Sequence, residues 1–181
     1  MIRKLDEGNL QFDFSAFQSA ERFDDKAINA YGLKAVDFVA EDADSLYFIE
    51  VKDFQHPNAT SARRKADNDM LNAAVGDKKA AFPIEMGVKI KDSLLRKYAL
   101  GEQPSKSIVY LLVINSDKLG ERERGLLKEK IGNHVPTGLN ESRFSAFKSI
   151  KFDLVNSQQL RDYSITCSAI TEVDTLESAI G

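Results

Sequence analysis

Apolar and polar residues alternate along two neighbouring stretches in the first half of the chain. Residues 34–40 alternate in the manner of a strand, and residues 46–54 are rich in aromatic and β-branched side chains. The polar segment at 41–45, Glu-Asp-Ala-Asp-Ser, lies between them. Two such runs joined by a short polar segment are typical of antiparallel strands with a tight turn. The pattern therefore predicts a β-hairpin.

Two later runs also have the character of strands. Residues 107–115 are almost uninterruptedly apolar, which is typical of a strand buried on both faces of a sheet. Residues 149–155 alternate, with Ile150, Phe152 and Leu154 on one side. The mostly polar residues 55–82 show little periodicity, and we expect there a long connection with at most one short helix.

Apolar residues recur at helical spacing in other parts of the chain. The stripe within residues 12–31 consists of Phe14, Phe17, Ala20, Ile28 and Tyr31. The stripe within residues 83–100, expected to face the core, consists of Ile84, Val88, Leu95 and Tyr98, with Pro83 at the start and Gly101 after the end. A third helix is predicted over about 119–131 and a short one over 157–163.

The order of these elements is helix, strand, strand, helix, strand, helix, strand. This order indicates an α/β fold, with a mixed central β-sheet flanked by helices on both faces. A length of 181 residues suits one domain, so we expect residues 1–181 to form a single unit.

Composition narrows the expected surroundings and partners. The single cysteine, Cys167, the lack of a signal-peptide pattern and the lack of a long apolar run predict a soluble cytoplasmic protein without a membrane partner. The net charge of −3 argues against a strongly basic nucleic-acid binder, so any phosphate contact must use local patches. The candidates are Arg63, Arg64 and Lys65 in the polar stretch, and Lys91 beside the core stripe of the second helix.

Three charged residues, Asp37, Glu50 and Lys52, interrupt the apolar runs of the hairpin. Burying a charge costs several kcal/mol unless it is paired or binds a metal. A turn centred on Ala43 and Asp44 places Asp37 opposite Glu50, with their Cβ atoms about 4.5 to 5.5 Å apart, and Glu50 and Lys52 share a face. A shift of one residue in this register would move Asp37 to the other face.

Two opposed carboxylates repel each other, so a cation is expected between them. Lys52 is one candidate, but Mg²⁺ fits better because hard carboxylate oxygens can hold it and leave room for water and phosphate. The first predicted helix offers a further carboxylate, since Glu21 and Asp24 lie near its apolar stripe. The alternative is that both stay in water at the edge of that stripe.

These residues resemble the PD-(D/E)xK nuclease superfamily, also described as restriction-endonuclease-like. The core of that superfamily has a helix, a β-hairpin carrying Asp and then (Asp/Glu)-x-Lys, a further helix and another strand. Asp37 matches the aspartate, residues 50–52 match the triplet, and Glu21 matches a helix glutamate of some members. An acidic-x-Lys triplet occurs three times in the chain, but only residues 50–52 lie in an apolar strand. The resemblance covers about residues 12–115, and Val36 stands where a proline is usual.

The resemblance implies a Mg²⁺- or Mn²⁺-dependent nuclease that hydrolyses phosphodiester bonds, with DNA as the expected substrate. Asp37 and Glu50 would hold the metal, with the backbone carbonyl of Val51 as a further ligand. Lys52 would orient the attacking water or neutralise charge on the phosphate, and Glu21 would support the site.

Two alternatives remain open at this stage. One is a subunit that keeps the nuclease fold but is silent, or is active only in a larger complex or as a homodimer, and binds nucleic acid or assembles with a partner. The other is an α/β interaction module whose triplet is a structural salt bridge. The scattered His56, His134 and Cys167 support neither a zinc site nor a cysteine–histidine pair.

Overall fold

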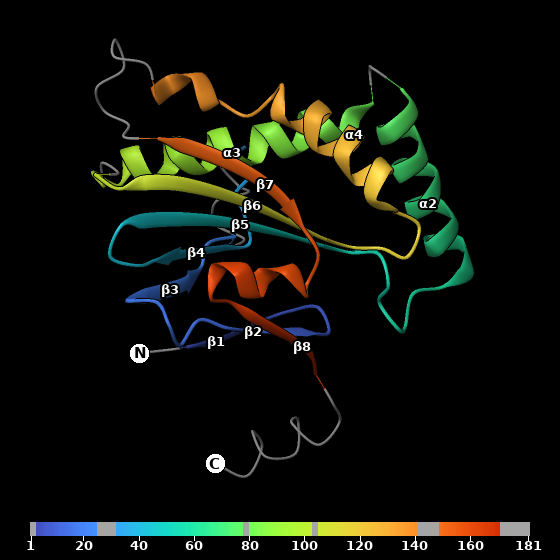
Figure 1. The fold of residues 1–181 in the computed structure, drawn as a ribbon, viewed down its shortest axis with the longest axis horizontal. Helices are drawn as coiled ribbons and strands as arrows, with labels where there is room; N and C mark the ends of the chain where they lie inside the picture. Colours follow the sequence, from blue (N-terminus) through green and yellow to red (C-terminus); the bar gives the residue numbers. More distant parts are fainter. Residues whose placement is uncertain (1–2, 25–31, 78–79, 103–104, 141–148, 171–181) are drawn as a thin grey trace.

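The computed structural model describes residues 3–24, 32–77, 80–102, 105–140 and 149–170. These residues form three layers, which Figure 1 shows from the side. A helical layer lies over a central five-stranded sheet, and a small three-stranded sheet lies below it. The small sheet has the order β1-β2-β8, with β1 at Lys4–Glu7, β2 at Leu10–Asp13 and β8 at Thr166–Ala169.

The central sheet has the order β3-β4-β5-β6-β7 and is mixed. Its strands are β3 (Ser19–Arg22), β4 (Phe38–Glu41), β5 (Ser45–Asp53), β6 (Ser107–Asn115) and β7 (Ile150–Val155). β3, β4 and β5 pair antiparallel, whereas β5, β6 and β7 pair parallel. The pairs Phe38–Ile49 and Glu41–Leu46 centre the hairpin turn on Ala43 and Asp44. The predicted turn and register are therefore confirmed, and strands are present as predicted at 107–115 and 149–155. The first strand of the hairpin was predicted over 34–40 but begins only at Phe38, so residues 34–37 precede it.

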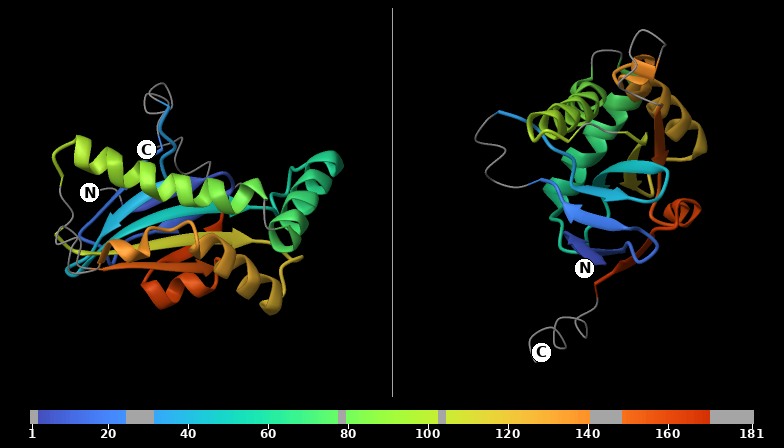
Figure 2. Two further views of the ribbon diagram at one scale, coloured as in Figure 1. Left: turned by 90° about the horizontal axis from the view of Figure 1, so that it is seen from above. Right: turned by 90° about the vertical axis from the view of Figure 1, so that its left-hand side faces the viewer.

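The three long helices are α2 (Ser61–Gly76), α3 (Ala81–Ala99) and α4 (Glu121–Gly132). Helices α3 and α4 lie over one face of this sheet, whereas α2 packs against both of them beyond the ends of β5 and β6, as Figures 1 and 2 show. The strands β5, β6 and β7 follow one another in the same direction across the sheet, and right-handed crossovers between them place every connecting helix on the same side. Among the described residues, the long helices therefore do not flank both faces of the sheet as predicted.

The other face of the sheet packs on the small sheet and on a short 3₁₀ helix, η2 (Gln159–Tyr163). Its core includes Phe12 and Phe14 from the N-terminal region and Leu160 and Ile165 from the C-terminal region. The second 3₁₀ helix, η1 (Thr137–Asn140), lies near the helical layer, where Leu139 joins the core between the helices and the sheet. Both ends of the described chain thus meet beneath the central sheet.

The predicted helix over residues 12–31 is not present in its described part. Residues 10–14 alternate instead, with Leu10, Phe12 and Phe14 buried. Asp13 then ends β2, because its Oδ1 accepts hydrogen bonds from the backbone N–H of Ser15 at 2.8 Å and from the hydroxyl of Ser15 at 2.5 Å. The stripe positions Ile28 and Tyr31 lie outside the described residues.

The helix predicted at 83–100 is present as α3, but its predicted core face is wrong. Ile84 and Leu95 are exposed, whereas Phe82, Met86, Ile90 and Leu94 are buried at intervals of four residues. The stretch after the hairpin contains α2, which is longer than the predicted short helix. None of the helices in the described ranges has the length and apolar character needed to cross a membrane.

Candidate functional site

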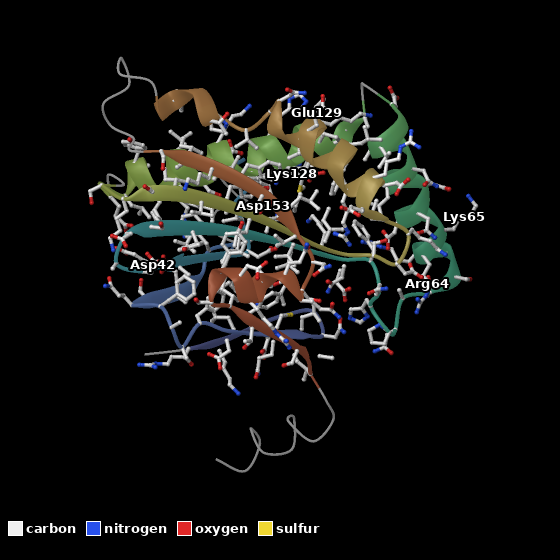
Figure 3. The ribbon with its side chains drawn as sticks, in the orientation of Figure 1. Asp42, Arg64, Lys65, Lys128, Glu129 and Asp153 are labelled. Carbon is white, nitrogen blue, oxygen red and sulfur yellow. The ribbon has the colours of Figure 1, made fainter. Side chains whose placement is uncertain are left out.

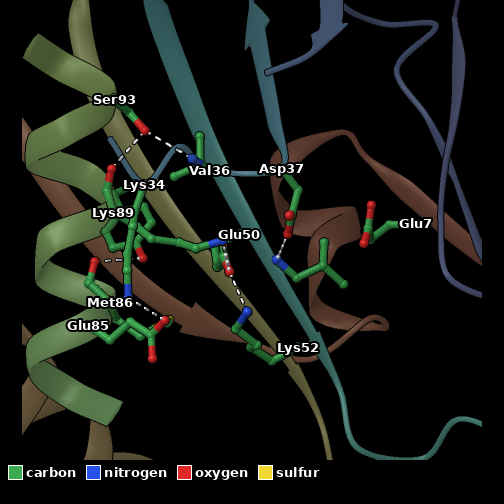
Figure 4. Close-up of polar contacts among 12 residues, drawn as sticks. Glu7, Lys34, Val36, Asp37, Glu50, Lys52, Glu85, Met86, Lys89 and Ser93 are labelled. Atoms are coloured by element: carbon green, nitrogen blue, oxygen red, sulfur yellow. Dashed lines mark hydrogen bonds and ion pairs between the residues drawn. The ribbon is translucent and has the colours of Figure 1, made fainter. Parts of the chain in front are cut away.

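Glu50 lies between two lysines on the helix side of β5. Lys89 Nζ of α3 is 2.8 Å from Glu50 Oε1 and donates a hydrogen bond to Oε2 at 2.8 Å. Lys52 Nζ lies 2.6 Å from Oε1, and Figure 4 shows the two ammonium groups approaching the carboxylate from opposite sides. Glu50 is fully buried, so these two cations replace the water that would otherwise stabilise its charge.

Asp37 brings a second carboxyl group next to this cluster. It lies just before β4, and its Oδ2 accepts a hydrogen bond of 2.6 Å from the backbone N–H of Val51. Burial raises the pKa of Asp37, and the negative charge of Glu50 raises it further, while Lys89 and the Val51 N–H act in the opposite direction. The net result is a pKa of about 7, so Asp37 changes its protonation state near neutral pH.

Hydrogen bonds fix α3 to the segment that carries Asp37. The hydroxyl of Ser93 donates to the carbonyl of Lys89 at 2.7 Å and accepts the backbone N–H of Val36 at 3.0 Å. The neighbouring residue of α3, Asp92, accepts the backbone N–H of Lys34 at 2.9 Å. The positions of Lys89 and Asp37 are therefore coupled through the backbone, although 52 residues separate them in sequence.

Two further titratable groups at the site, Lys52 and Tyr110, have raised pKa values. Burial alone would lower the pKa of Lys52, but the charge of Glu50 and the hydrogen bond to it outweigh that effect and raise the pKa. Tyr110 lies in the core beneath the site, where burial raises its pKa well above the ordinary value and the charges of Glu50 and Asp37 add to the shift. Its hydroxyl donates to the Met86 carbonyl at 3.1 Å. At neutral pH, Lys52 is therefore an ammonium ion and Tyr110 a neutral phenol.

Asp37, Glu50, Val51 and Lys52 thus come together, but Glu21 does not join them. Glu21 lies on β3, not on a helix, and its side chain is 60% exposed and paired with Lys97 at 3.3 Å. Glu7 of β1 is the acidic residue beside Asp37 in Figure 4, and its charge contributes to the raised pKa of Asp37. The predicted role of Glu21 fails because the predicted N-terminal helix is a strand at this point.

The predicted phosphate contacts lie apart from the cluster. Arg63 pairs with Asp67 at 2.9 Å and Lys65 with Asp69 at 2.6 Å, both along α2. The Arg64 guanidinium donates to backbone carbonyls of the preceding loop, at His56, Pro57 and Ala59. Figure 3 shows Arg64 and Lys65 at the outer edge of the molecule, so this basic group is a surface of α2 and not a wall of the site.

Lys91 is exposed and Lys89 is the lysine of α3 that faces the sheet. Two residues correspond to about 200° around a helix, so the two lysines point in nearly opposite directions. The sequence pattern did not predict Lys89 as a site residue, because the predicted core stripe lies on the wrong side of α3. The spacing of Phe82, Met86, Ile90 and Leu94 was a signal that could have found it, since Lys89 borders that stripe.

The donor set is compatible with a small divalent cation. Asp37 and Glu50 supply hard oxygen atoms, and their mutual repulsion, visible in the raised pKa of Asp37, is what a cation would relieve. Mg²⁺ usually takes one or two carboxylates and keeps several waters. The described residues contain no group of three or more His, Cys, Asp or Glu side chains placed to hold a metal ion, so water or substrate would complete the coordination.

Comparisons of this chain with protein-family models, with curated proteins and with solved structures find no match.

Proposed function

We propose that this protein is a Mg²⁺- or Mn²⁺-dependent nuclease that hydrolyses phosphodiester bonds in DNA. The observation that supports the proposal most is the cluster on β5, where a buried Glu50 contacts Lys52 and Lys89 next to a buried Asp37. Two carboxylates for a hard cation, beside a lysine that reaches the surface, are the groups that such hydrolysis needs. The hairpin register that brings them together is the one the family resemblance requires.

Each residue of the cluster has a definite role in this proposal. Asp37 and Glu50 would hold the metal, with the Val51 carbonyl as a further ligand, and the metal would act as a Lewis acid at the phosphate. Lys52, whose side chain is 29% exposed, can move its ammonium group from Glu50 towards a bound phosphate. Lys89, at 11% exposure, stays with Glu50 and keeps that carboxylate ionised and oriented.

The test is cleavage of plasmid, single-stranded DNA, branched DNA and RNA by the purified protein with Mg²⁺ or Mn²⁺. We expect cleavage of at least one DNA substrate, and we expect Lys52→Ala to abolish it. Lys128→Ala is the matched control, because Lys128 pairs with Asp153 at 2.7 Å outside the Glu50 cluster and its loss should leave cleavage unchanged. Cleavage that persists in both Asp37→Ala and Lys52→Ala would refute the site.

The lysine contacts of Glu50 also favour a second candidate function, a catalytically silent or partner-dependent subunit of the same fold. Both oxygens of Glu50 already contact lysines, so the cluster balances its charges as two carboxyl groups and two ammonium groups without a metal. In that case the protein would bind nucleic acid or a partner protein, possess no activity alone, and use the cluster as a structural ion pair.

Thermal unfolding with added metal separates the two candidates. A metal site at Glu50 predicts that Mn²⁺ raises the Tm of the wild-type protein and that Glu50→Gln makes this rise smaller. A structural cluster predicts that Glu50→Gln leaves the Mn²⁺-induced change in Tm as it is in the wild-type protein. Wild-type protein that binds Mn²⁺ at this site without cleaving any of the substrates would indicate dependence on a partner.

A further inference from the structure

A hollow of about 280 Å³ lies on the opposite side of β5, between the central sheet and the small sheet. Its lining comes from the ends of β5 and β6, the loop after β7, the β1–β2 turn and β8, and consists of Asn9, Leu10, Asp53, Gln55, Asn115, Ser157, Cys167, Ser168 and Ala169. The hollow lies at the carboxyl ends of parallel strands, which is where open α/β sheets commonly bind ligands. The Glu50 cluster does not share any of these residues.

Two buried oxygen atoms of this lining lack a hydrogen-bond donor within the described part of the chain. They are Oδ2 of Asp53 and Oδ1 of Asn9. The other oxygen of Asp53 accepts the backbone N–H of Gln55 at 3.1 Å, which fixes the orientation of the carboxylate. An unpaired buried acceptor costs about 1 to 3 kcal/mol, and more if it is charged, so a bound species is expected to satisfy these atoms.

The charge of Asp53 determines what kind of species fits. None of the nine lining residues is Lys, Arg or His. Cys167 supplies no charge, because burial and the nearby charge of Asp53 raise the pKa of its thiol to about 11. His56, just after the lining residue Gln55, turns its Nδ1 to the backbone N–H of Asn58. The hollow therefore presents one negative charge and amide oxygens, and it calls for a cation.

We propose that this hollow binds a hydrated divalent cation, with Asp53 Oδ2 and Asn9 Oδ1 as its protein ligands. Mg²⁺ and Mn²⁺ favour carboxylate and amide oxygens, and Mg²⁺ commonly keeps several of its waters. At roughly 30 Å³ per water, the volume accommodates an ion together with its hydration shell. The remaining amides and hydroxyls of Asn115, Ser157 and Ser168 would bind those waters. This second site is independent of the proposed nuclease activity.

Binding of Mn²⁺, measured as loss of the electron paramagnetic resonance signal of free Mn²⁺, tests this proposal. The measurement compares wild-type protein with Asp53→Asn, Glu50→Gln and the double variant. We expect Asp53→Asn to weaken one binding event by roughly tenfold or more, whether or not Glu50→Gln changes binding. Asp69→Asn is the matched control, because it makes the same change at an exposed carboxylate of α2 that lines neither the hollow nor the Glu50 cluster, and it should leave Mn²⁺ binding unchanged.

The possible outcomes separate this site from the Glu50 cluster. Loss of Mn²⁺ binding in Glu50→Gln together with unchanged binding in Asp53→Asn would overturn the proposal and leave the Glu50 site intact. The reverse pattern would support the hollow and count against the metal site of the proposed function. Unchanged binding in both variants would mean that only water fills the hollow. If Asp53→Asn fails to fold, Asn9→Ala provides the second measurement, with the same expected direction.

Discussion

Glu50 and Asp53 lie three residues apart on β5 but face opposite sides of the central sheet. Glu50 is fully buried and contacts the ammonium groups of Lys52 and Lys89. Asp53 faces the small sheet, where its Oδ2 has no donor among the described residues and its hollow has no cationic side chain. The face of a strand, more than the residue type, therefore decides whether an acidic side chain lies beside lysines of the same fold.

Glu50→Gln and Asp53→Asn each replace a carboxylate with an amide, and we expect their effects on the free energy of unfolding to differ strongly. Glu50→Gln leaves Lys89 buried without its counter-charge, so we expect a loss of about 3 to 5 kcal/mol in the free energy of unfolding. Asp53→Asn removes no ion pair and takes away a buried charge that has no donor, so in the absence of metal we expect no loss and a gain of up to about 1 to 3 kcal/mol. Urea unfolding at pH 8 in EDTA measures both. Equal losses in the two variants would show that Asp53 has a cationic partner in the folded protein.

The pH dependence of the free energy of unfolding should identify Asp37 as the member of the Glu50 cluster whose ionised form is disfavoured in the folded protein. Its folded pKa of about 7 lies above the ordinary value of 3.8, so the folded state binds the proton more tightly than the unfolded state. The resulting stabilisation is complete below about pH 4 and is lost as the pH rises through 7. The loss amounts to about 4 kcal/mol at 1.36 kcal/mol per pKa unit.

The Asp37→Asn variant isolates this effect, because titrating groups that do not interact with Asp37 cancel in the difference between the two proteins. We expect the variant to be more stable than the wild type at pH 8 and the advantage to shrink steadily towards pH 4. Urea unfolding in EDTA across this pH range measures the difference. An advantage that does not change with pH would contradict the raised pKa. If the metal site exists, added Mn²⁺ should reduce the advantage at pH 8, since the cation favours the ionised carboxyl of Asp37.

Sequence patterns predicted the part of the site that depends on local geometry. The spacing of Glu50 and Lys52 and the short turn at Ala43 and Asp44 determine which side chains share a face, so the hairpin register followed from them. The long helices lie on one side of the sheet because of the strand order. No local stretch of the sequence determines that order. Whether helices cover one face of the sheet or both therefore depends on the strand order, which the periodicity of apolar residues cannot reveal.

Other errors have local causes. The apolar residues of the N-terminal region fit both a helical stripe and a strand alternation, and the Asp13–Ser15 turn decides for strands. On α3, apolar residues occur on two sides, and Ile84 and Leu95 were assigned to the core although they are exposed. That choice concealed Lys89, which is the partner of Glu50 from a distant part of the chain. Both errors arose because the local pattern allowed two arrangements, of which the wrong one was chosen.

The smallest difference in stability is expected between substitutions of Lys52 and Lys89, the two lysines that contact Glu50. Lys89 is 11% exposed and Lys52 is 29% exposed, so water can replace Lys52 more easily than Lys89. We expect Lys89→Met to cost about 1 to 3 kcal/mol, because part of a buried carboxylate loses its partner. We expect Lys52→Met to cost less than about 1 kcal/mol, as for ion pairs that reach solvent.

Urea unfolding of these two variants, alone and combined with Glu50→Gln, forms two double-mutant cycles that isolate each pair. The coupling of Lys89 to Glu50 should exceed that of Lys52, and only the Lys52 coupling should weaken in high salt, since exposed charges are screened more strongly than buried ones. Equal couplings would mean that Lys52 is held as firmly as Lys89. In that case Lys52 could not leave Glu50 to reach a phosphate, and the catalytic role proposed for it would lose its structural basis.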